Sequence, residues 1–213
     1  MAGISSRSSN PDERSRTRRF FNLVSVIYPF IERNLTPAYR TALEKLDLTT
    51  GLSVMDLATG TGILAGVFAE RGHPTTGMDF AANLLDRARR KFPAVTFREM
   101  DLVELDGIRD RSFGIISMGY FLHGVDAEFR KEVLTEAARI ASDYVVVFDY
   151  GRPGNFVVRF IEWVEGPHYP AYLAASREAE FREAGLEIVE DFPTSDFGQV
   201  WVCRHLPAPS VCQ

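Results

Sequence analysis

The sequence predicts an α/β fold, with seven strands in one mostly parallel sheet, helices on both faces and a C-terminal antiparallel hairpin. The first observation is that short apolar runs alternate with amphipathic stretches from Leu52 onward, which is typical of repeated strand–helix units. The second is that the last two apolar runs are joined only by "FPTSDFG". This link is too short for a crossover helix, so the two strands should pair antiparallel.

The elements can be placed in chain order. Strands are expected at Ser53–Leu57, Pro74–Met78, Val95–Glu99, Gly114–Met118, Tyr144–Asp149, Glu187–Asp191 and Val200–Arg204. Helices are expected between them at Ile63–Arg71, Ala82–Lys91, Glu128–Ala141 and Ser176–Ala184. The carboxyl ends of parallel strands share one edge of a sheet, and open α/β folds bind ligands there.

Two aromatic segments do not fit this alternation. Residues 20–48 have apolar residues at mostly helical spacing, broken at Pro29 and restarted after Thr36 and Pro37, which predicts two helices in an N-terminal lid. Residues 151–176, "GRPGNFVVRFIEWVEGPHYPAYLAAS", are too aromatic for a plain linker and too broken by Pro and Gly for one helix. We expect them to form a substrate-side insertion beside the ligand edge.

Length and composition fit one domain. The chain has 213 residues, 46% of them hydrophobic, which suffices for one good core. We assign residues 20–206 to a single domain, preceded by a flexible tail at 1–19 and followed by a C-terminal tail at 207–213. The N-terminal tail is rich in Ser and Arg without apolar periodicity, and Asp12 and Glu13 count against a transit peptide.

Charge and cysteine content argue against several functions. The net charge of −5 disfavours a protein that holds nucleic acid mainly by phosphate contacts. Cys203 and Cys212 are the only cysteines, so no disulfide framework or CxxC metal site can be built, and a reducing cytoplasm fits. The apolar run Phe20–Ile31 contains polar residues and Pro29 and is shorter than the roughly 20 residues of a membrane span. No metal, nucleic-acid partner or membrane insertion is expected.

The stretch "GTGILA", Gly60–Ala65, lies between an expected strand and an expected helix. It satisfies the Rossmann-like dinucleotide pattern G-x-G-x-x-G/A, and Asp79 follows about 20 residues later, as that pattern requires. Taken alone, the pattern indicates an NAD-dependent oxidoreductase. That alternative lacks an evident Tyr-x-x-x-Lys pair in this chain.

Asp56, at the end of the first expected strand, favours a different cofactor. A pyrophosphate binds to backbone N–H groups at a helix N-terminus and gains nothing from a nearby carboxylate. The cationic methionyl group of S-adenosylmethionine, with its free ammonium, does gain from an anion there. Gly60 and Gly62 would let the backbone approach such a cofactor, because neither residue has a Cβ.

Two further acids end the next two strands. Asp79 can accept hydrogen bonds from both ribose hydroxyls, which serves NAD and S-adenosylmethionine alike. Asp101 can accept from the adenine amine, with Met100 and Leu102 as apolar walls. Each acid alone could be a cap or a turn residue. Three acids at consecutive strand ends, with the glycine turn at the first, instead predict a cup for an adenosine that carries positive charge.

Several motifs resemble those of class I S-adenosylmethionine-dependent methyltransferases. They are "VMDLATGTG", "GMDFAANLLDRARRKF", "EMDL" and "SFGIISMGYFLHGV", and the resemblance spans residues 15–205 in order and spacing. Within that class the chain is most similar to the ubiquinone/menaquinone C-methyltransferase-like (methyltransferase type 11) group. "FFNLVSVIYPFI" resembles the N-terminal segment of that group, with Tyr28 at its tyrosine, and "YLAAS" (Tyr172–Ser176) resembles its Y-L-x-x-S element.

The resemblance implies a set of cofactor-binding residues. They are Tyr28, Asp56, Ala58, Thr59, Gly60, Thr61, Gly62, Asp79, Phe80, Met100, Asp101, Leu102, Ser117 and Met118. The chain departs from the usual pattern at three places. Ala58 stands at the usual first glycine, Pro29 replaces the acid after the tyrosine, and Gly114 replaces an acid before the fourth strand. These departures weaken the inference of a quinone substrate more than they weaken the inference of the cofactor.

Methyl transfer from a sulfonium is an in-line displacement, and an acceptor oxygen or carbon with an acidic proton would need a base. The candidate catalytic residues are His123, His168 and Tyr150. His123 follows the fourth strand, but it could equally cap the next helix. His168, with Tyr169 and Tyr172, could line an aromatic pocket or belong to a packed lid. Neither histidine has a sequence partner that would make a triad, and Asp149 is expected to cap a loop.

Together these observations predict a methyltransferase that acts on a small, apolar or aromatic acceptor. Aromatic residues could line its cavity or belong to the core: Phe20, Phe21, Tyr28, Phe156, Phe160, Trp163 and Tyr169. An NAD-dependent oxidoreductase and a non-catalytic S-adenosylmethionine-binding protein are the alternatives. The oligomeric state stays open, with a dimer as one option.

Overall fold

A computed structural model describes residues 28–156, 158 and 167–207, with backbone alone for residues 28–34. Its seven strands form one sheet in the order β3-β2-β1-β4-β5-β7-β6. The strands are β1 Val54–Leu57, β2 Thr75–Asp79, β3 Thr96–Glu99, β4 Phe113–Gly119, β5 Ala141–Tyr150, β6 Leu186–Pro193 and β7 Gly198–His205. The first five strands pair parallel and β7 pairs antiparallel with both β5 and β6, so the predicted fold class is confirmed.

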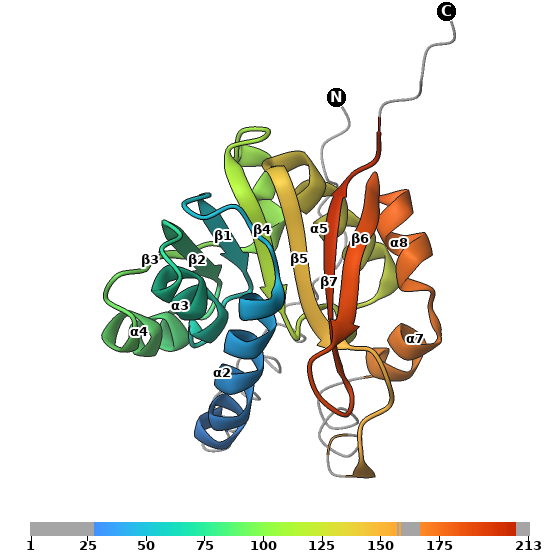
Figure 1. Cartoon of the computed structure of the whole chain (residues 1–213), viewed down its shortest axis with the longest axis horizontal. Coiled ribbons are helices and arrows are strands. Elements are labelled where there is room, and N and C mark those ends of the chain that lie inside the picture. The colour runs from blue at the N-terminus through green and yellow to red at the C-terminus, as the bar shows by residue number, and fades with distance from the viewer. Residues whose placement is uncertain (1–27, 157, 159–166, 208–213) are drawn as a thin grey trace, which may run out of the picture.

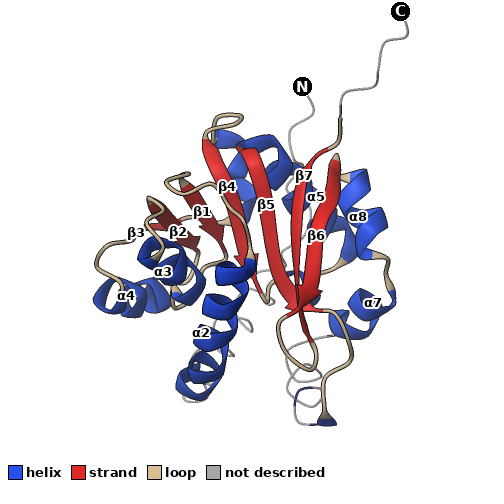
Figure 2. Cartoon of the chain, viewed as in Figure 1, coloured by secondary structure: helices blue, strands red, loops and turns tan. Residues whose placement is uncertain are grey.

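Helices lie on both faces of this sheet (Figures 1 and 2). The α-helices are α2 Tyr28–Lys45, α3 Ile63–Glu70, α4 Ala82–Lys91, α5 Ala127–Ile140, α7 His168–Ala174 and α8 Arg177–Glu183. Two short 3-10 helices, η1 Leu102–Gly107 and η2 Leu122–Gly124, follow β3 and β4. Each strand and each helix expected from Leu52 onward is found, with its ends within three residues of the expected ones.

Alternation along the strands divides the core between the two faces. Val54 of β1 packs with apolar residues of α2 and α3, including Leu43 and Phe68. Met55, the next residue, packs on the other face with α5 residues such as Leu134. Successive side chains of a strand point to opposite faces, and all four residues of β1 ("VMDL"), Asp56 included, are buried.

The helix before β1 corrects one expectation. Two helices with a restart after Thr36 and Pro37 were expected, but α2 is a single helix that contains Pro37. A proline removes one backbone hydrogen bond and costs about 3 kcal/mol in a helix interior. Burial of Tyr39 and Leu43 against the sheet offsets that cost, since fully burying one large apolar side chain stabilises by about 1.5–3 kcal/mol.

The substrate-side insertion is described only in part. Residues 157 and 159–166, with Phe160 and Trp163, lie outside the described residues, as do 1–27, with Phe20 and Phe21, and 208–213, with Cys212. The described part contains α7, which lies next to η2 at the edge where β4 and β5 end (Figure 1). Phe156 is 83% exposed, so it belongs to no core. The domain limits at 20–206 stay predictions.

No helix among the described residues has both the length and the apolar character that a membrane span requires.

Candidate functional site

The turn after β1 has an unusual backbone. Ala58, Gly60 and Gly62 all have left-handed φ angles, of 51°, 55° and 77°. This conformation disfavours a Cβ, which is the physical reason why a glycine suits the position of Ala58. The Gly62 N–H donates to the carbonyl of Thr59 at 2.9 Å, and α3 begins at the next residue. The chain therefore turns directly from the sheet edge into a helix N-terminus.

Two glycines of this turn face different surroundings. A Cβ at Gly62 would lie 2.7 Å from the ring of Phe97, so this glycine lets α3 pack against β3. A Cβ at Gly60 would have no atom within 4 Å. Gly60 thus borders open space, and a bound molecule can approach its backbone closely there.

Asp56 is 1% exposed and points into this region from β1. Its Oδ1 accepts a hydrogen bond from the Ser117 hydroxyl at 2.7 Å, and its Oδ2 accepts one from the Thr59 hydroxyl at 2.5 Å. Burial raises the pKa of Asp56 to about 6, although these hydrogen bonds favour the ionised form. A buried carboxylate whose pKa is raised by desolvation gains from a nearby cation.

Asp79 joins the end of β2 to the glycine turn. Its Oδ2 accepts from the Gly60 N–H at 2.8 Å, and its Oδ1 accepts from the Ala81 N–H at 2.9 Å. Burial raises the pKa of Asp79 as well. The carboxylate has more lone pairs than backbone donors, so it can still accept from a ligand hydroxyl. Asp79 and Gly60 therefore border the same open space.

The other expected cofactor residues differ in their contacts and burial. Asp101 caps η1, accepting from the Val103 N–H at 3.3 Å. Met100 and Leu102 are partly buried against the core, and Phe80 is 42% exposed at the end of β2. Thr61 and Met118 are buried, with Met118 inside the core on the α5 face. The side chain of Tyr28 lies outside the described ones, so its role stays a prediction.

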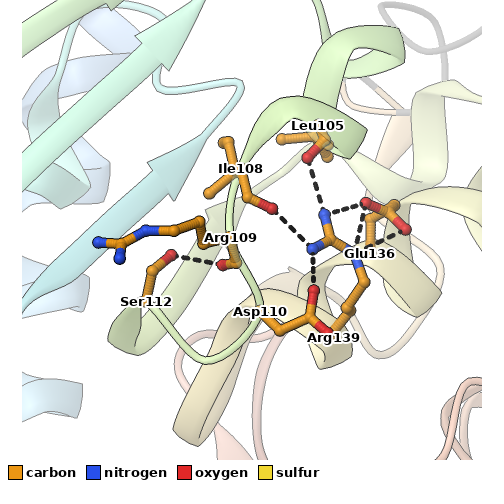
Figure 3. A network of polar contacts seen from close by, with 7 residues as sticks. All are labelled: Leu105, Ile108, Arg109, Asp110, Ser112, Glu136 and Arg139. Carbon is orange, nitrogen blue, oxygen red and sulfur yellow. Dashed lines mark hydrogen bonds and ion pairs between the residues drawn. The ribbon is translucent and has the colours of Figure 1, made fainter.

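Arg139 of α5 holds the loop that follows Asp101 (Figure 3), a role that no local sequence pattern predicts. Its guanidinium donates to the carbonyls of Leu105 and Ile108 at 2.8 and 2.6 Å. It also pairs with Glu136 and Asp110, each at 2.5 Å, and hydrogen bonding to Glu136 raises its pKa. The Arg139 side chain thus connects α5, η1 and the segment that leads from η1 to β4.

An open hollow of about 390 Å³ lies under the same loop, lined by Met55, Arg98, Met100, Glu104, Gly107, Ile108, Arg109, Ser112 and Phe113. Met55 and Asp56 are neighbours in β1, so they point to opposite faces of the sheet. The hollow is therefore distinct from the open space that Asp56, Gly60 and Asp79 border.

His123 and Asp149 form a buried pair at the carboxyl ends of β4 and β5. Nδ1 of His123 lies 2.7 Å from Oδ1 of Asp149, and the His123 backbone N–H donates to Oδ2 at 3.2 Å. The Tyr150 N–H also donates to Oδ1, at 2.8 Å. Sequence reasoning left His123 without a partner because 26 residues separate the pair, whereas the parallel strands β4 and β5 bring their ends together.

Aromatic rings surround this histidine. The ring centroid of Tyr150 lies 4.8 Å from that of His123, and those of Tyr169 and Tyr120 lie 6.2 and 6.4 Å away. The Tyr169 hydroxyl accepts from the Gly154 N–H at 2.8 Å. His168 is only half-buried at the start of α7. Its neighbour Tyr169 is buried and packs against His123.

Sequence comparison connects the chain to methyltransferases. Residues 54–143 match a family model described as a methyltransferase domain. A demethylmenaquinone methyltransferase of Chlorobaculum tepidum is 32% identical over 117 residues, which is 50% of this chain and 48% of the relative. One of Tropheryma whipplei is 30% identical over 156 residues, which is 67% and 62% of the two chains. The chain thus spans about half to two thirds of the length of these relatives.

Fold comparison agrees. A TehB-like S-adenosylmethionine-dependent methyltransferase of Corynebacterium glutamicum matches with a TM-score of 0.62 and 20% identity, over 87% of this chain and 100% of the other. A putative methyltransferase in complex with the Trm112 activator of Haloferax volcanii gives 0.68 and 18%, over 90% and 99%. At this identity the likeness shows the fold. Residues 54–143 thus match a methyltransferase domain, and the fold and the motifs are similar to those of class I S-adenosylmethionine-dependent methyltransferases.

Proposed function

We propose that this chain binds S-adenosylmethionine at the carboxyl edge of β1–β3 and transfers its methyl group to a small aromatic acceptor. The observation that carries the proposal is the open space bordered by Gly60, Asp56 and Asp79, where a carboxylate on each side is held in place by the glycine turn. A nucleoside with a cationic side chain fits such a donor and acceptor set.

Each carboxylate has a distinct role in this proposal. Asp79 accepts from the ribose hydroxyls through the lone pairs that its backbone hydrogen bonds do not use. Asp101 accepts from the adenine amine, with Phe80 and Leu102 beside the ring. Asp56 offsets the positive charge of the methionyl ammonium, and Ser117 and Thr59 orient its carboxylate.

In methyl transfer from a sulfonium, the protein need not form a covalent bond to the substrate. When bound, the cofactor supplies a methyl group on a positively charged sulfur. The chain's own residues position that group against the acceptor and exclude water, and both effects accelerate an in-line displacement in which charge disappears. The family also favours this cofactor over NAD, although the glycine pattern alone indicates a dinucleotide.

The acceptor class is proposed from two supports. Relatives act, by name, on demethylmenaquinone and, in Nostoc sp., on 2-phytyl-1,4-naphthoquinone. In this chain, the rings of Tyr120, Tyr150 and Tyr169 lie at the adjacent strand ends, where flat aromatic molecules can stack. A small quinone-like aromatic molecule is therefore the proposed acceptor.

Calorimetric titration with S-adenosylhomocysteine tests the cofactor site. Asp79→Asn keeps the size of the side chain but loses the charge and an acceptor, so affinity should fall about 10- to 100-fold, in line with 1.5–3 kcal/mol for a hydrogen bond to a charged group. Asp86→Asn, an exposed acid on α4, is the matched control and should bind like the wild type. Undiminished binding by Asp79→Asn would contradict the assignment.

Turnover requires a second measurement. Incubation with methyl-labelled S-adenosylmethionine and a reduced naphthoquinone should give labelled product in a reaction that needs intact Asp79. Binding without transfer to this acceptor, or to any aromatic compound of a metabolite extract, would favour the non-catalytic alternative. Quenching of NADH fluorescence, with no binding of S-adenosylhomocysteine, would favour the oxidoreductase.

Location and partners belong to the same proposal. Cys203 is buried and free, and burial raises the pKa of its thiol to about 12, so it suits a reducing compartment as an inert core residue. We place the protein in the cytoplasm with a small-molecule acceptor and no nucleic-acid partner. Its oligomeric state, a dimer being one option, is open to a sedimentation measurement.

A further inference from the structure

The geometry points to His123 and Asp149 as a proton-accepting pair for an acceptor that carries an aromatic hydroxyl group. This inference rests on the proposed function and narrows its acceptor class. Among the described residues of the cofactor site, the three acids are assigned to the cofactor, so none of them is proposed to take a proton from an acceptor. A separate base at the acceptor side is therefore needed if the acceptor must ionise.

The contacts of Asp149 decide the tautomer of His123. Asp149 is 0% exposed and accepts backbone N–H bonds from both His123 and Tyr150. An ionised carboxylate can only accept, so at 2.7 Å Nδ1 of His123 carries the hydrogen. The lone pair of the neutral imidazole is then on Nε2. The carboxylate also stabilises the imidazolium that forms when Nε2 takes a proton.

The rings around His123 fit an aromatic molecule. Tyr150, Tyr169, Tyr172 and Tyr120 face it with centroids at 4.8–6.4 Å. Tyr120 and Tyr150 are only partly buried and lie edge to face at 5.1 Å, so they present ring surface that a flat ligand can contact.

Tyr120 also holds a backbone conformation that is rare for a large residue. Its φ is 52°, and its N–H donates to the Phe148 carbonyl at 2.7 Å. Left-handed backbone at a non-glycine residue is strained, and such residues are enriched at functional sites. Here it aims the loop from Tyr120 to His123 across the end of β5.

Strand pairing puts this pair beside the cofactor site. Ser117 of β4 bonds to Asp56, and the chain leaves β4 two residues later, at Gly119, to reach His123. Asp149 is the penultimate residue of β5, which pairs parallel with β4. The His123–Asp149 pair and the cofactor carboxylates therefore lie at the same edge of the sheet, on adjacent strands.

The proposed step couples proton transfer to methyl transfer. The acceptor O–H bond breaks, its proton moves to Nε2 of His123, and the electron pair stays on the ring oxygen. That pair forms the bond to the methyl carbon while the S–CH₃ bond breaks, and the bonding electrons return to sulfur. If the ring carbon beside the oxygen attacks instead, that carbon loses its proton afterwards and the oxygen regains one. Either route releases one proton to water through the imidazole.

The test uses 4-nitrophenol, an aromatic hydroxyl compound whose ionised form absorbs at longer wavelength than its neutral form. The probe is added to the full chain saturated with S-adenosylhomocysteine, at a pH below the pKa of the free probe. Asp149→Asn offers Nδ1 an amide N–H and so favours the opposite tautomer, while His123→Gln removes the ring. His73→Gln is the matched control, because His73 is also 5% exposed and its Nδ1 lies 3.0 Å from the Leu52 carbonyl.

The wild type and His73→Gln should bind the probe in its ionised form, and both site variants should show about tenfold less of the ionised band. The proposal is overturned if the wild type binds only neutral probe or none, or if His123→Gln keeps the wild-type band. S-adenosylhomocysteine binding is measured on the same samples. If the wild type does not bind S-adenosylhomocysteine, the proposed function is contradicted. If it binds S-adenosylhomocysteine normally but holds the probe in its neutral form, only the role of His123 and Asp149 is contradicted. If Asp149→Asn does not fold, His123→Gln decides.

Discussion

The hydroxyl of Ser117 donates a 2.7 Å hydrogen bond to the carboxylate of Asp56 across the parallel pair β1 and β4. The two residues are direct partners in the strand register, so both point to the same face of the sheet. This hydrogen bond lowers the pKa of Asp56, which burial raises to about 6. Ser117 therefore helps to keep a buried acid ionised near neutral pH.

Cofactor affinity should depend on pH through Asp56. A cation prefers the ionised carboxylate, so affinity for S-adenosylmethionine should be full above pH 6 and fall about tenfold per pH unit below it. Ser117→Ala should move this midpoint upward, because a hydrogen bond to the ionised form is lost. The control is Ser112→Ala, whose hydroxyl donates to the Arg109 carbonyl elsewhere. Calorimetry over a pH series gives both midpoints, and equal midpoints would argue against the contact.

The free energy of unfolding should also depend on pH through Asp56, and it should decrease as the pH rises. The folded pKa of Asp56 is above the ordinary value of 3.8, so the folded state binds more protons than the unfolded state between pH 3.8 and about 6. The contribution of Asp56 to the free energy of unfolding thus falls as pH rises through this window, by up to about 3 kcal/mol. Asp56→Asn should remove this change, and urea unfolding of both proteins at pH 4 and 7 measures it. A wild-type difference that persists in Asp56→Asn would assign it to other groups.

Local patterns predicted much of the fold, and they placed Asp56, Asp79 and Asp101 at or next to the ends of β1, β2 and β3, where the structure has them. Strand, turn and helix around Gly60 follow from apolar runs and glycines that are neighbours in the sequence, and the acids at strand ends needed only the assumption of a parallel sheet. Pro37 was misread because local propensity favours a break there, whereas packing of Tyr39 and Leu43 maintains one helix.

Contacts between distant residues could not be predicted. His123 and Asp149 meet because β4 and β5 pair, and Arg139 meets Leu105 because α5 crosses η1, at a separation of 34 residues. Neither pair leaves a periodicity or a motif in a single sequence. The sequence therefore predicts only a loop cap at Asp149, which is part of its role, since it accepts the backbone N–H of Tyr150.

A substitution at Gly60 should reduce cofactor affinity much more than it reduces stability. Gly60→Ala places a Cβ into open space at a φ of 55°, so it should lower stability by only about 1–2 kcal/mol but reduce S-adenosylhomocysteine affinity at least about tenfold. Gly185→Ala is the matched control, with a φ of 82°, no atom near its Cβ and a position at the start of β6. Equal affinity of the two variants would contradict a cofactor at Gly60.

Gly62 should behave in the opposite way. A Cβ there would meet Phe97 at 2.7 Å, in addition to the left-handed φ of 77°. Overpacking costs about 1–3 kcal/mol beyond the backbone term, so Gly62→Ala should lower the free energy of unfolding more than Gly60→Ala does. Thermal unfolding of the two variants without ligand makes the comparison. Equal destabilisation would show that Phe97 moves aside.

Arg139 should order the loop that carries Asp101. Arg139→Gln removes the donors to Leu105 and Ile108 and leaves both carbonyls and Asp110 without this cation, so we expect about 1–3 kcal/mol of lost stability. Amide exchange should accelerate over 102–110, and S-adenosylhomocysteine affinity should fall several-fold because Asp101 caps η1. Arg182→Gln, which loses only an exposed pair with Glu178, should change neither quantity. Unchanged exchange in Arg139→Gln would mean that η1 holds itself through its own backbone bonds, and the cofactor loop would then be independent of α5.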